Sequence, residues 1–440
     1  MLNRFLFTKV DNSQLIIFRV FFGILVALES YGAILTGWVK KTLIDPNFTF
    51  SFIGFDWLQP LPGNGMHFYF FVMGTLGVFI ALGYKYRLSI ITFSFMWLFV
   101  YLMQKTSYNN HYYLLLLISI FMCFFPANKS LSIDVKQNSS LQSNTMHSYV
   151  KWVIVLQLFL VYTYASIAKL YGDWLDFGVI EILMKDKVDY PLIGSFLQQA
   201  WVQKTIGITG IVFDLLIVPA LLWKPTRKVA FIISLFFHLF NSIIFQIGIF
   251  PYLALAFTVF FFEPEVIRKI FFKKKEPYLQ SEVRVPSYKG ILLLGVSIYF
   301  ILQILLPIRH YFIKDDVLWT EEGHRMSWRM MLRNRTGTIQ FKIVDKKNGN
   351  AQIVNLNEHL TEKQKSKVVA YPDFIWQFAQ MLKNEYATNG KNISVYAQNS
   401  KVSINGRPYK AFIDPYVDLA NEPWNHFKHH EWIFPSHLDQ

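Results

Sequence analysis

Residues 150–170, VKWVIVLQLFLVYTYASIAKL, decide what kind of protein this chain is. No side chain between Trp152 and Ala168 carries a charge, and a helix that crosses a bilayer needs about 20 mainly apolar residues. Lys169 follows where such a helix would leave the membrane. Its amine could reach back to the membrane interface, or it could lie in a protein-lined pocket and act as a base. The function of the chain depends on which of these is true.

The composition extends this interpretation to the whole chain of 440 residues. Hydrophobic residues make up 53% and charged residues only 16%, whereas soluble domains carry roughly 25% charged residues. The net charge of +14 comes mostly from basic residues between apolar runs, so membrane topology explains it better than nucleic acid does. Cys123 is the only cysteine, which excludes an intramolecular disulfide and argues against a cysteine-based metal site. We therefore predict a multi-pass α-helical membrane protein that binds no nucleic acid.

Nine apolar segments qualify as spans, and the N-terminal one is interpreted as uncleaved because no small-residue cleavage site follows it. If the N-terminus is cytoplasmic, every inside loop is basic, as the positive-inside rule requires. An odd number of spans then places the C-terminal region outside the cytoplasm. The expected spans are Leu15–Thr36, His67–Leu82, Leu88–Met103, Tyr112–Phe125, Val150–Leu170, Ile206–Leu222, Val229–Phe245, Ile249–Phe262 and Ile291–Leu306.

The region from Pro307 to Gln440 differs from the rest in composition. Thr338–Val344 and Ile393–Ala397 alternate polar and apolar residues, which is typical of strands, and Asn348–Gly349 suits a turn. Glu362–Ala387 has a helical pattern that Pro372 interrupts. We expect two parts: a helical membrane part over residues 1–306, and an extracytoplasmic α+β or β-rich domain over residues 307–440.

Polar residues at membrane depth each need an explanation, because burying them in lipid is costly. The predicted orientation places Asn109, Asn110, His111, Lys169 and Asn241 in the outer half of the membrane and His238 near its middle. His238 and Asn241 lie one turn apart on the same helical face. Buried histidines often only bond neighbouring helices, and we expect structural pairs for Arg19, Glu29 and Asp214. No metal is expected, since His111 and His238 lack a third ligand at a known spacing.

Several motifs at these residues resemble the vitamin K-dependent γ-glutamyl carboxylases. They occur in the family's order between about Tyr101 and Pro435. The motifs are KTSYNNHYYL (105–114), AKLYGDW (168–174), FHLFNSIIFQIGIFPY (237–252), LPIRHYF (306–312), MSWRMM (326–331) and VSINGRPYKAFIDPYVD (402–418). The chain is similar to compact bacterial homologues, also called HTTM (horizontally transferred transmembrane) proteins, and we expect it to be a compact form without the long C-terminal extension of the animal enzymes.

The resemblance implies a reaction. The family oxidises vitamin K hydroquinone with O2, and the oxygenated product removes a γ-proton from a peptidyl glutamate, which then takes up CO2. Lys169 matches the base that deprotonates the hydroquinone, and His111 and His238 match further functional positions. Asn109, Asn110, Asn241 and Trp174, which lie in the same motifs, are expected to help bind the quinone. From charge alone, Arg325 and Arg329 are candidates for binding the glutamate side chain.

The resemblance also implies the setting: the bacterial inner membrane, or the ER membrane in a eukaryote. The co-substrates would be vitamin K hydroquinone or a related naphthoquinone, O2 and CO2. The partners would be a Glu-containing peptide or protein and the lipid bilayer, and a quinone-reducing enzyme is a candidate third partner. Two alternatives stay open. One is a quinol epoxidase or other quinone-linked enzyme that carboxylates no glutamate, and the other is a transporter or assembly factor without enzymatic activity.

Overall fold

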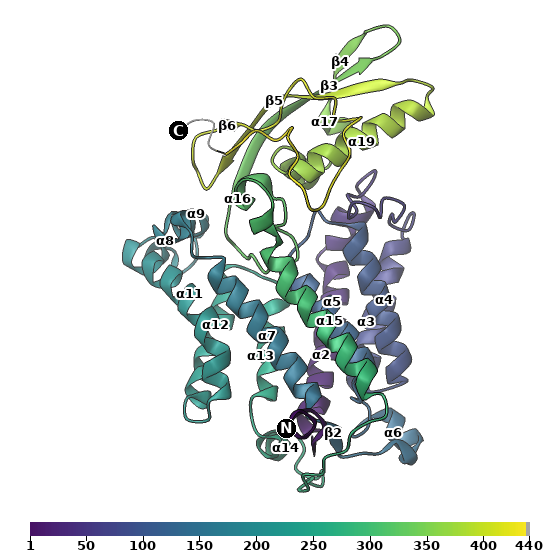
Figure 1. Cartoon of the computed structure of the whole chain (residues 1–440), viewed down its shortest axis with the longest axis vertical. Coiled ribbons are helices and arrows are strands. Elements are labelled where there is room, and N and C mark those ends of the chain that lie inside the picture. The colour runs from purple at the N-terminus through teal and green to yellow at the C-terminus, as the bar shows by residue number, and fades with distance from the viewer. Residues whose placement is uncertain (437–440) are drawn as a thin grey trace.

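A computed structural model describes residues 1–436 and shows a helical bundle with a sheet-containing domain at one end (Figure 1). In the described part of the chain, seven helices are long and apolar enough to cross a membrane. These are α2 (Ser13–Leu35), α3 (Gly65–Leu82), α4 (Tyr86–Met103), α7 (Tyr149–Ile167), α11 (Ala200–Leu222), α12 (Arg227–Ile244) and α15 (Lys289–Ile308).

The two other expected spans take less regular forms. Helix α5 (Asn110–Phe124) has 15 residues, fewer than a perpendicular span needs. The expected span Ile249–Phe262 consists of α13 (Phe250–Phe257) and the short 3-10 turn Thr258–Phe260, and just beyond it the chain bends by 116° into α14 (Pro264–Phe271). Pro264 explains this bend, since the ring disfavours helical geometry at the preceding residue, and Glu263 is extended.

The first residues of the chain and the C-terminal domain lie at opposite ends of the bundle (Figure 1). Strand β1 (Lys9–Asp11) pairs with β2 (Thr145–His147), and Thr8 forms a bridge with Val283. The chain therefore returns to its starting end after α2–α5, and again after α7, α11, α12 and the bent α13–α14 pair. Helix α15 then carries it to the other end, where the C-terminal domain lies. The multi-helix bundle with several candidate spans and the C-terminal α+β domain predicted from the sequence are confirmed.

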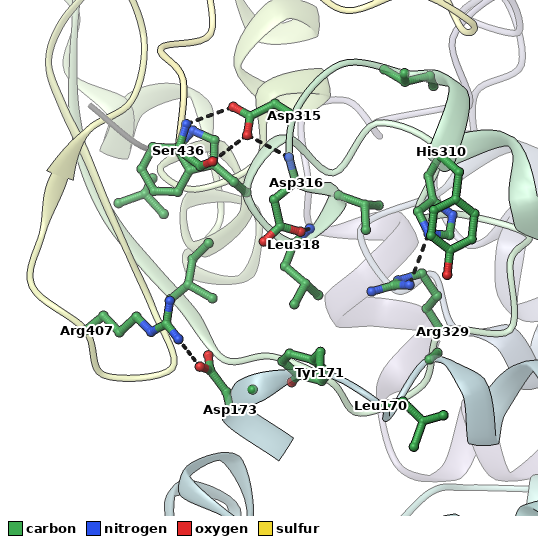
Figure 2. Close-up of a pocket in the computed structure, with 18 of the residues that line it drawn as sticks. Leu170, Tyr171, Asp173, His310, Asp315, Asp316, Leu318, Arg329, Arg407 and Ser436 are labelled. Carbon is green, nitrogen blue, oxygen red and sulfur yellow. Dashed lines mark hydrogen bonds and ion pairs between the residues drawn. The ribbon is translucent and has the colours of Figure 1, made fainter. Parts of the chain in front are cut away.

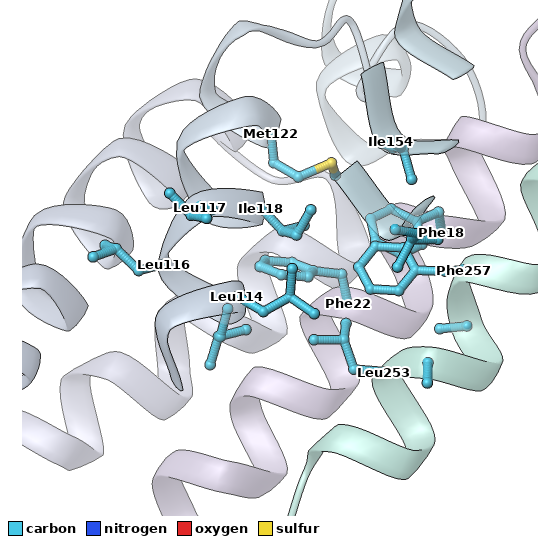
Figure 3. Close-up of a cluster of buried hydrophobic side chains, with 14 of the residues drawn as sticks. Phe18, Phe22, Leu114, Leu116, Leu117, Ile118, Met122, Ile154, Leu253 and Phe257 are labelled. Carbon is cyan, nitrogen blue, oxygen red and sulfur yellow. The ribbon is translucent and has the colours of Figure 1, made fainter. Parts of the chain in front are cut away.

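The bundle closes around an apolar core between α2, α5, α7 and α13 (Figure 3). Phe18 and Phe257 stack with ring centroids 5.0 Å apart. Arg19 is buried in α2 and donates to carbonyl oxygens after α5, while Glu29 accepts from the Tyr112 hydroxyl at 2.7 Å. The expectation of structural pairs needs correcting here, since both charges find neutral partners. Buried members of this core include Phe22, Leu114, Ile118, Met122, Ile154 and Leu253.

The C-terminal domain is an antiparallel sheet of order β4-β3-β5-β6, covered by α19 (Pro372–Thr388). The strands are β3 (Arg335–Asp345), β4 (Ala351–Ile353), β5 (Ile393–Ile404) and β6 (Lys410–Ala411). The two predicted strand segments lie in β3 and β5, and the turn at Asn348–Gly349 joins β3 to β4, with Gly349 at φ +72°. Pro372 divides the predicted helix into α18 (Glu362–Val368) and α19, so these predictions are confirmed. The apolar core of this domain includes Phe341, Phe374, Phe378 and Val395.

Short helices fill the connections. They are α1 (Leu2–Phe7), α6 (Ile133–Gln137), α8 (Gly172–Leu175), α9 (Gly178–Lys185), α10 (Gly194–Leu197), α16 (Val317–Thr320) and α17 (Leu356–His359).

Buried ion pairs join the domain to the bundle. Lys105, in the loop before α5, lies 2.5 Å from Asp373 of α19, and Arg325 reaches the same carboxylate at 2.6 Å. Burial lowers the pKa of Lys105 to about 8, although Asp373 favours its charged form. Burial alone would raise the pKa of Asp373, but Arg325 and Lys105 outweigh this and hold that pKa below its usual range. A second contact joins Asp173, in α8, to Asn405 and Arg407.

Candidate active site

The side chain of Lys169 turns back into the protein. Helix α7 ends at Ile167, and the Lys169 backbone N–H donates to the Ser166 carbonyl at 3.0 Å. The Lys169 ammonium donates to the carbonyl of Ala165, one turn earlier, at 3.0 Å. The residue is only 6% exposed. The amine therefore does not extend to the membrane interface, which was one of the two alternatives for this residue.

Asp214 of α11 is the partner of this amine. The Lys169 Nζ and an Asp214 carboxylate oxygen lie 2.5 Å apart, and both side chains are 8% exposed. Gly210, one turn before Asp214, lies beside the lysine stem, since a Cβ there would be in ordinary contact with Lys169 Cε at 3.8 Å. The Trp174 ring lies 5.4 Å from the ammonium and adds a cation–π contact. A buried amine is thus held by one carboxylate, one carbonyl and one aromatic face.

These groups line a cavity of about 400 Å³ whose other walls are mostly apolar. His111 from α5 and Asn241 from α12 also line it. Its wall includes exposed residues of α11 and α12, so the cavity opens on the side of the bundle that faces lipid; these are Thr205, Thr209, Ile233 and Phe236. Apolar clefts of roughly 300–1,000 Å³ with a few polar groups are typical of small-molecule sites. The structure therefore brings Lys169, His111, Asn241 and Trp174 together in one lateral cavity.

The two histidines flank the ring of Phe250. His111 stacks on this ring at 5.2 Å, and His238 meets it edge-on at 5.9 Å. His238 is fully buried, and its Nε2 lies 3.0 Å from the hydroxyl of Tyr162, which lines the cavity. Within residues 1–436, Nδ1 of each histidine is buried without a hydrogen-bond partner. His238 thus reaches the cavity through Tyr162, whereas His111 faces it directly.

The side chains of Asn109 and Asn110 form hydrogen bonds with backbone groups in this structure. The Asn109 side chain accepts from the Tyr112 N–H at 2.8 Å and caps α5, as asparagine favours. Asn110 donates to the Arg329 carbonyl at 2.9 Å and accepts from the Tyr108 hydroxyl at 3.0 Å. Neither lines the cavity of Lys169. They fix the start of the helix that carries His111, and quinone binding by them stays a prediction.

Arg329 and Arg325 lie in different places. Arg329 lines a second, polar cavity of about 560 Å³ between the bundle and the domain (Figure 2). Its Nη1 lies 3.4 Å from the His310 ring nitrogen, and Arg329 forms no ion pair within the described residues. Arg325 instead faces a third cavity of about 290 Å³ and is paired with Asp373. Of these two arginines, Arg329 is the one whose guanidinium is not matched by a carboxylate in the described part of the chain.

Two chain segments separate the apolar cavity from the polar one. In the first, Lys169 and Trp174 face the apolar cavity, whereas Leu170 and Tyr171 face the polar cavity. The second segment runs from Arg329, on the polar side, to Met330 and Met331, on the apolar side. Three non-glycine residues have left-handed backbone at φ 56–58°: Met331 in this second segment, and Met326 and Trp328 just before it. Such strain concentrates at functional sites.

Sequence reasoning did not assign Asp214 or Tyr162 to the site. The signal for Asp214 was its place as a lone carboxylate in the apolar run GIVFDLLIVP, since a charge inside a membrane needs a partner. Tyr162 carries no comparable signal among the many aromatic residues of α7. The described residues contain no group of three or more His, Cys, Asp or Glu side chains arranged to hold a metal ion.

Two protein-family models together match most of the sequence. The HTTM domain matches residues 7–265, and the lumenal domain of the vitamin K-dependent gamma-carboxylase matches residues 288–439. No solved structure matches the chain. The first match covers the bundle that holds Lys169, and the second covers the domain that faces the polar cavity. The chain belongs to the vitamin K-dependent γ-glutamyl carboxylase family.

Proposed function

We propose that this protein couples the epoxidation of vitamin K hydroquinone by O2 to the carboxylation of peptidyl glutamate with CO2. Membership of the family makes it a vitamin K-dependent carboxylase-like protein. The observation that carries the finer proposal is the pair of cavities on either side of one thin wall. Lys169, Asp214 and His111 lie on the apolar side, and Arg329 lies on the polar side.

The apolar cavity fits a prenylated hydroquinone. Its walls are mostly apolar, and it opens toward lipid. Among residues 1–436 the buried Nδ1 of His111 has no hydrogen-bond partner, and a quinol oxygen could fill this role. His111, Lys169, Asn241 and Trp174 would hold the ring. The bound hydroquinone, together with O2, supplies the strong base that the removal of a γ-proton requires.

Lys169 is proposed to remove the hydroxyl proton that starts the reaction. An amine must be neutral to accept a proton, and Asp214 at 2.5 Å can take the proton that the ammonium carries. Burying two separate charges in an apolar cavity is costly. This cost reduces the free-energy difference between the ion pair and the state in which amine and carboxyl are both neutral. Asp214 thus positions Lys169 and exchanges a proton with it. Tyr162, which lines the same cavity, is hydrogen-bonded to the buried His238.

The polar cavity is proposed to admit the glutamate side chain. Arg329 can bind its carboxylate, since a guanidinium forms two parallel hydrogen bonds with that group. Arg325 suits this role less well because Asp373 already occupies it. The γ-carbon would then approach the wall at Leu170 and Tyr171 from the extracytoplasmic side. The N-terminus would be cytoplasmic, in the bacterial inner membrane, and a separate quinone-reducing enzyme would supply the hydroquinone.

The test uses the purified full-length protein with reduced vitamin K, labelled bicarbonate and a Glu-rich peptide. Vitamin K epoxide and labelled peptide are expected from the wild type and neither from Lys169→Ala. Lys204→Ala, which removes an exposed lysine of α11, is the matched control and should keep both activities. Equal activity of Lys169→Ala would refute its role as base. Epoxide without labelled peptide would identify a quinol epoxidase, and the absence of both products from the wild type would contradict the proposal.

A further inference from the structure

A groove of about 620 Å³ lies near the end of the bundle that is remote from the C-terminal domain. On α12, Lys228, Phe231, Ile232 and Leu235 line it at helical spacing, which places them on one face. Helix α13 and the turn after it supply a second stripe, and α14 lies across the end of the groove because of the 116° bend. The second stripe is Tyr252, Leu255, Ala256 and Val259.

The walls of this groove are apolar and partly exposed. Ile24, Ile232 and Ile270 are each at least 46% exposed, as side chains that face lipid tails would be. Edge-to-face contacts between Phe21 and Phe271, 5.7 Å apart, hold α14 against α2. The concavity therefore belongs to the packing of these helices, and a flat lipid-facing surface would not have this volume.

The rim of the groove carries unmatched positive charge. Nearby carboxylates are already paired: Glu263 with Arg227, Glu265 with Lys269, and Asp11 with Lys275. In the described part of the chain, no ion pair involves Lys228, the exposed lysine that lines the groove, or its neighbour Lys224. Lys228 lies at the start of α12, so its ammonium marks the polar end of an otherwise apolar groove.

We propose that this groove binds one acidic phospholipid from the membrane leaflet remote from the C-terminal domain. Its phosphate would contact Lys228, and an acyl chain would lie between α12 and α13 beneath α14. The charge of the rim favours an acidic lipid over a zwitterionic one. The nearby carboxylates are paired with other basic residues, so a net negative headgroup is needed to neutralise Lys228. The groove is lined by residues other than those of the Lys169 cavity, so this proposal is independent of the enzymatic one.

Native mass spectrometry of the delipidated full-length protein tests this proposal. Phosphatidylglycerol and phosphatidylcholine with identical dioleoyl chains are titrated in the same detergent. Phosphatidylglycerol should bind more tightly, and Lys228→Gln should weaken it about fivefold while leaving phosphatidylcholine unchanged, as expected for loss of one cation at the membrane surface. Lys204→Gln, at an exposed lysine that does not line the groove, should bind as the wild type does.

Two further measurements separate the groove from general surface binding. Ile232→Trp, at an exposed position, should fill the groove and weaken both lipids, and glycerol phosphate without acyl chains should not compete. Lys228→Glu should weaken phosphatidylglycerol more than Lys228→Gln does. Equal affinity of the wild type for the two lipids, or identical titrations of Lys228→Gln and Lys204→Gln, would overturn the proposal.

Discussion

The amine of Lys169 and the carboxylate of Asp214 lie 2.5 Å apart behind apolar walls, so each removes most of the cost of burying the other. Replacing a buried pair by apolar residues of similar size is often tolerated, whereas removing one partner leaves an uncompensated charge. The difference between single and double replacement therefore shows whether the two charges stabilise each other. It also allows the pair to be tested by stability, independently of any assay of catalysis.

We predict that Lys169→Met and Asp214→Leu each lower the free energy of unfolding by about 3 kcal/mol. The double variant should lose less than the sum of the two, because neither charge then remains buried alone. Thermal and denaturant unfolding in one detergent would measure all four proteins. If the two losses simply add, the pair is not energetically coupled.

The buried amine of Lys105 gives a pH-dependent prediction. Burial lowers its pKa from 10.5 in the unfolded chain to about 8 in the folded protein. Between these values the unfolded chain binds more protons, so the contribution of Lys105 to stability rises with pH, by up to about 1.4 kcal/mol per pH unit. The difference in unfolding free energy between the wild type and Lys105→Met should therefore increase from pH 8 to pH 10. A difference that stays constant would contradict the lowered pKa.

Charge counting along the sequence placed Lys169, His111 and Asn241 at one depth, and the structure brings these three to one cavity. The same counting could not show that Asp214 faces Lys169, because depth does not fix the rotation of a helix about its axis. That rotation follows from packing, here at Gly207 and Gly210, where α11 meets the aromatic rings of Phe177 and Trp174. The binding roles of individual residues remain predictions for the same reason.

At the scale of elements, α2 and α3 pack through small residues. A Cβ at Gly77 would lie 2.7 Å from the backbone nitrogen of Ala27, and one at Gly23 would meet the backbone of Ala81. Backbone cannot move aside as a flexible side chain can. Close approach of this kind is common between membrane helices, which gain little from hydrophobic burial against each other.

Gly77→Ala should therefore lower the free energy of unfolding by about 1–3 kcal/mol, the usual cost of overpacking. Gly32→Ala is the control, since it lies in α2 with no atom within 4 Å of its Cβ position. It should be neutral or stabilise by about 0.5–1 kcal/mol, because alanine suits a helix better than glycine does. Equal effects at both positions would show that α2 and α3 are not in close contact.

Gly210 on α11 links packing to the proposed reaction. A Cβ there would lie 3.4 Å from the Trp174 ring and 3.8 Å from Lys169 Cε, which is ordinary contact. Gly210→Ala should fold and keep activity, whereas the longer side chain of Gly210→Leu should enter the cavity and lower epoxide formation at least tenfold. Thermal unfolding would show whether Gly210→Leu remains folded. Full activity of a folded Gly210→Leu would place the quinone elsewhere.

The sequence located every long helix but not the form of two elements. Hydropathy marked the apolar run at Ile249–Phe262 but not the 116° bend that follows it; the signal for the bend was Pro264, just beyond the run. The strands in the C-terminal domain were easier to predict from the alternation of polar and apolar residues: burial alternates along much of β3, although four of the five residues Ile393–Ala397 in β5 are buried.

At the scale of the whole molecule, the two ends of the bundle face different compartments. The hairpin turn at Asn348 belongs to the extracytoplasmic domain, whereas Gln137, at the end of α6, lies near the N-terminus at the other end (Figure 1). Both positions are exposed. The single cysteine of the chain, Cys123, donates to the Ser119 carbonyl inside α5, so serine can replace it and still form this bond.

In a Cys123→Ser background, Asn348→Cys should react with a membrane-impermeant maleimide in intact spheroplasts. Gln137→Cys should react only after the membrane is permeabilised, because the proposed orientation places α6 in the cytoplasm. The charges agree with this result, since Lys129 and Lys136 beside α6 belong on the inside under the positive-inside rule. The reverse labelling pattern would mean that the protein has the opposite orientation in the membrane. It would also move the polar cavity, and the glutamate substrate proposed for it, to the cytoplasmic side, where a secreted peptide could not reach Arg329.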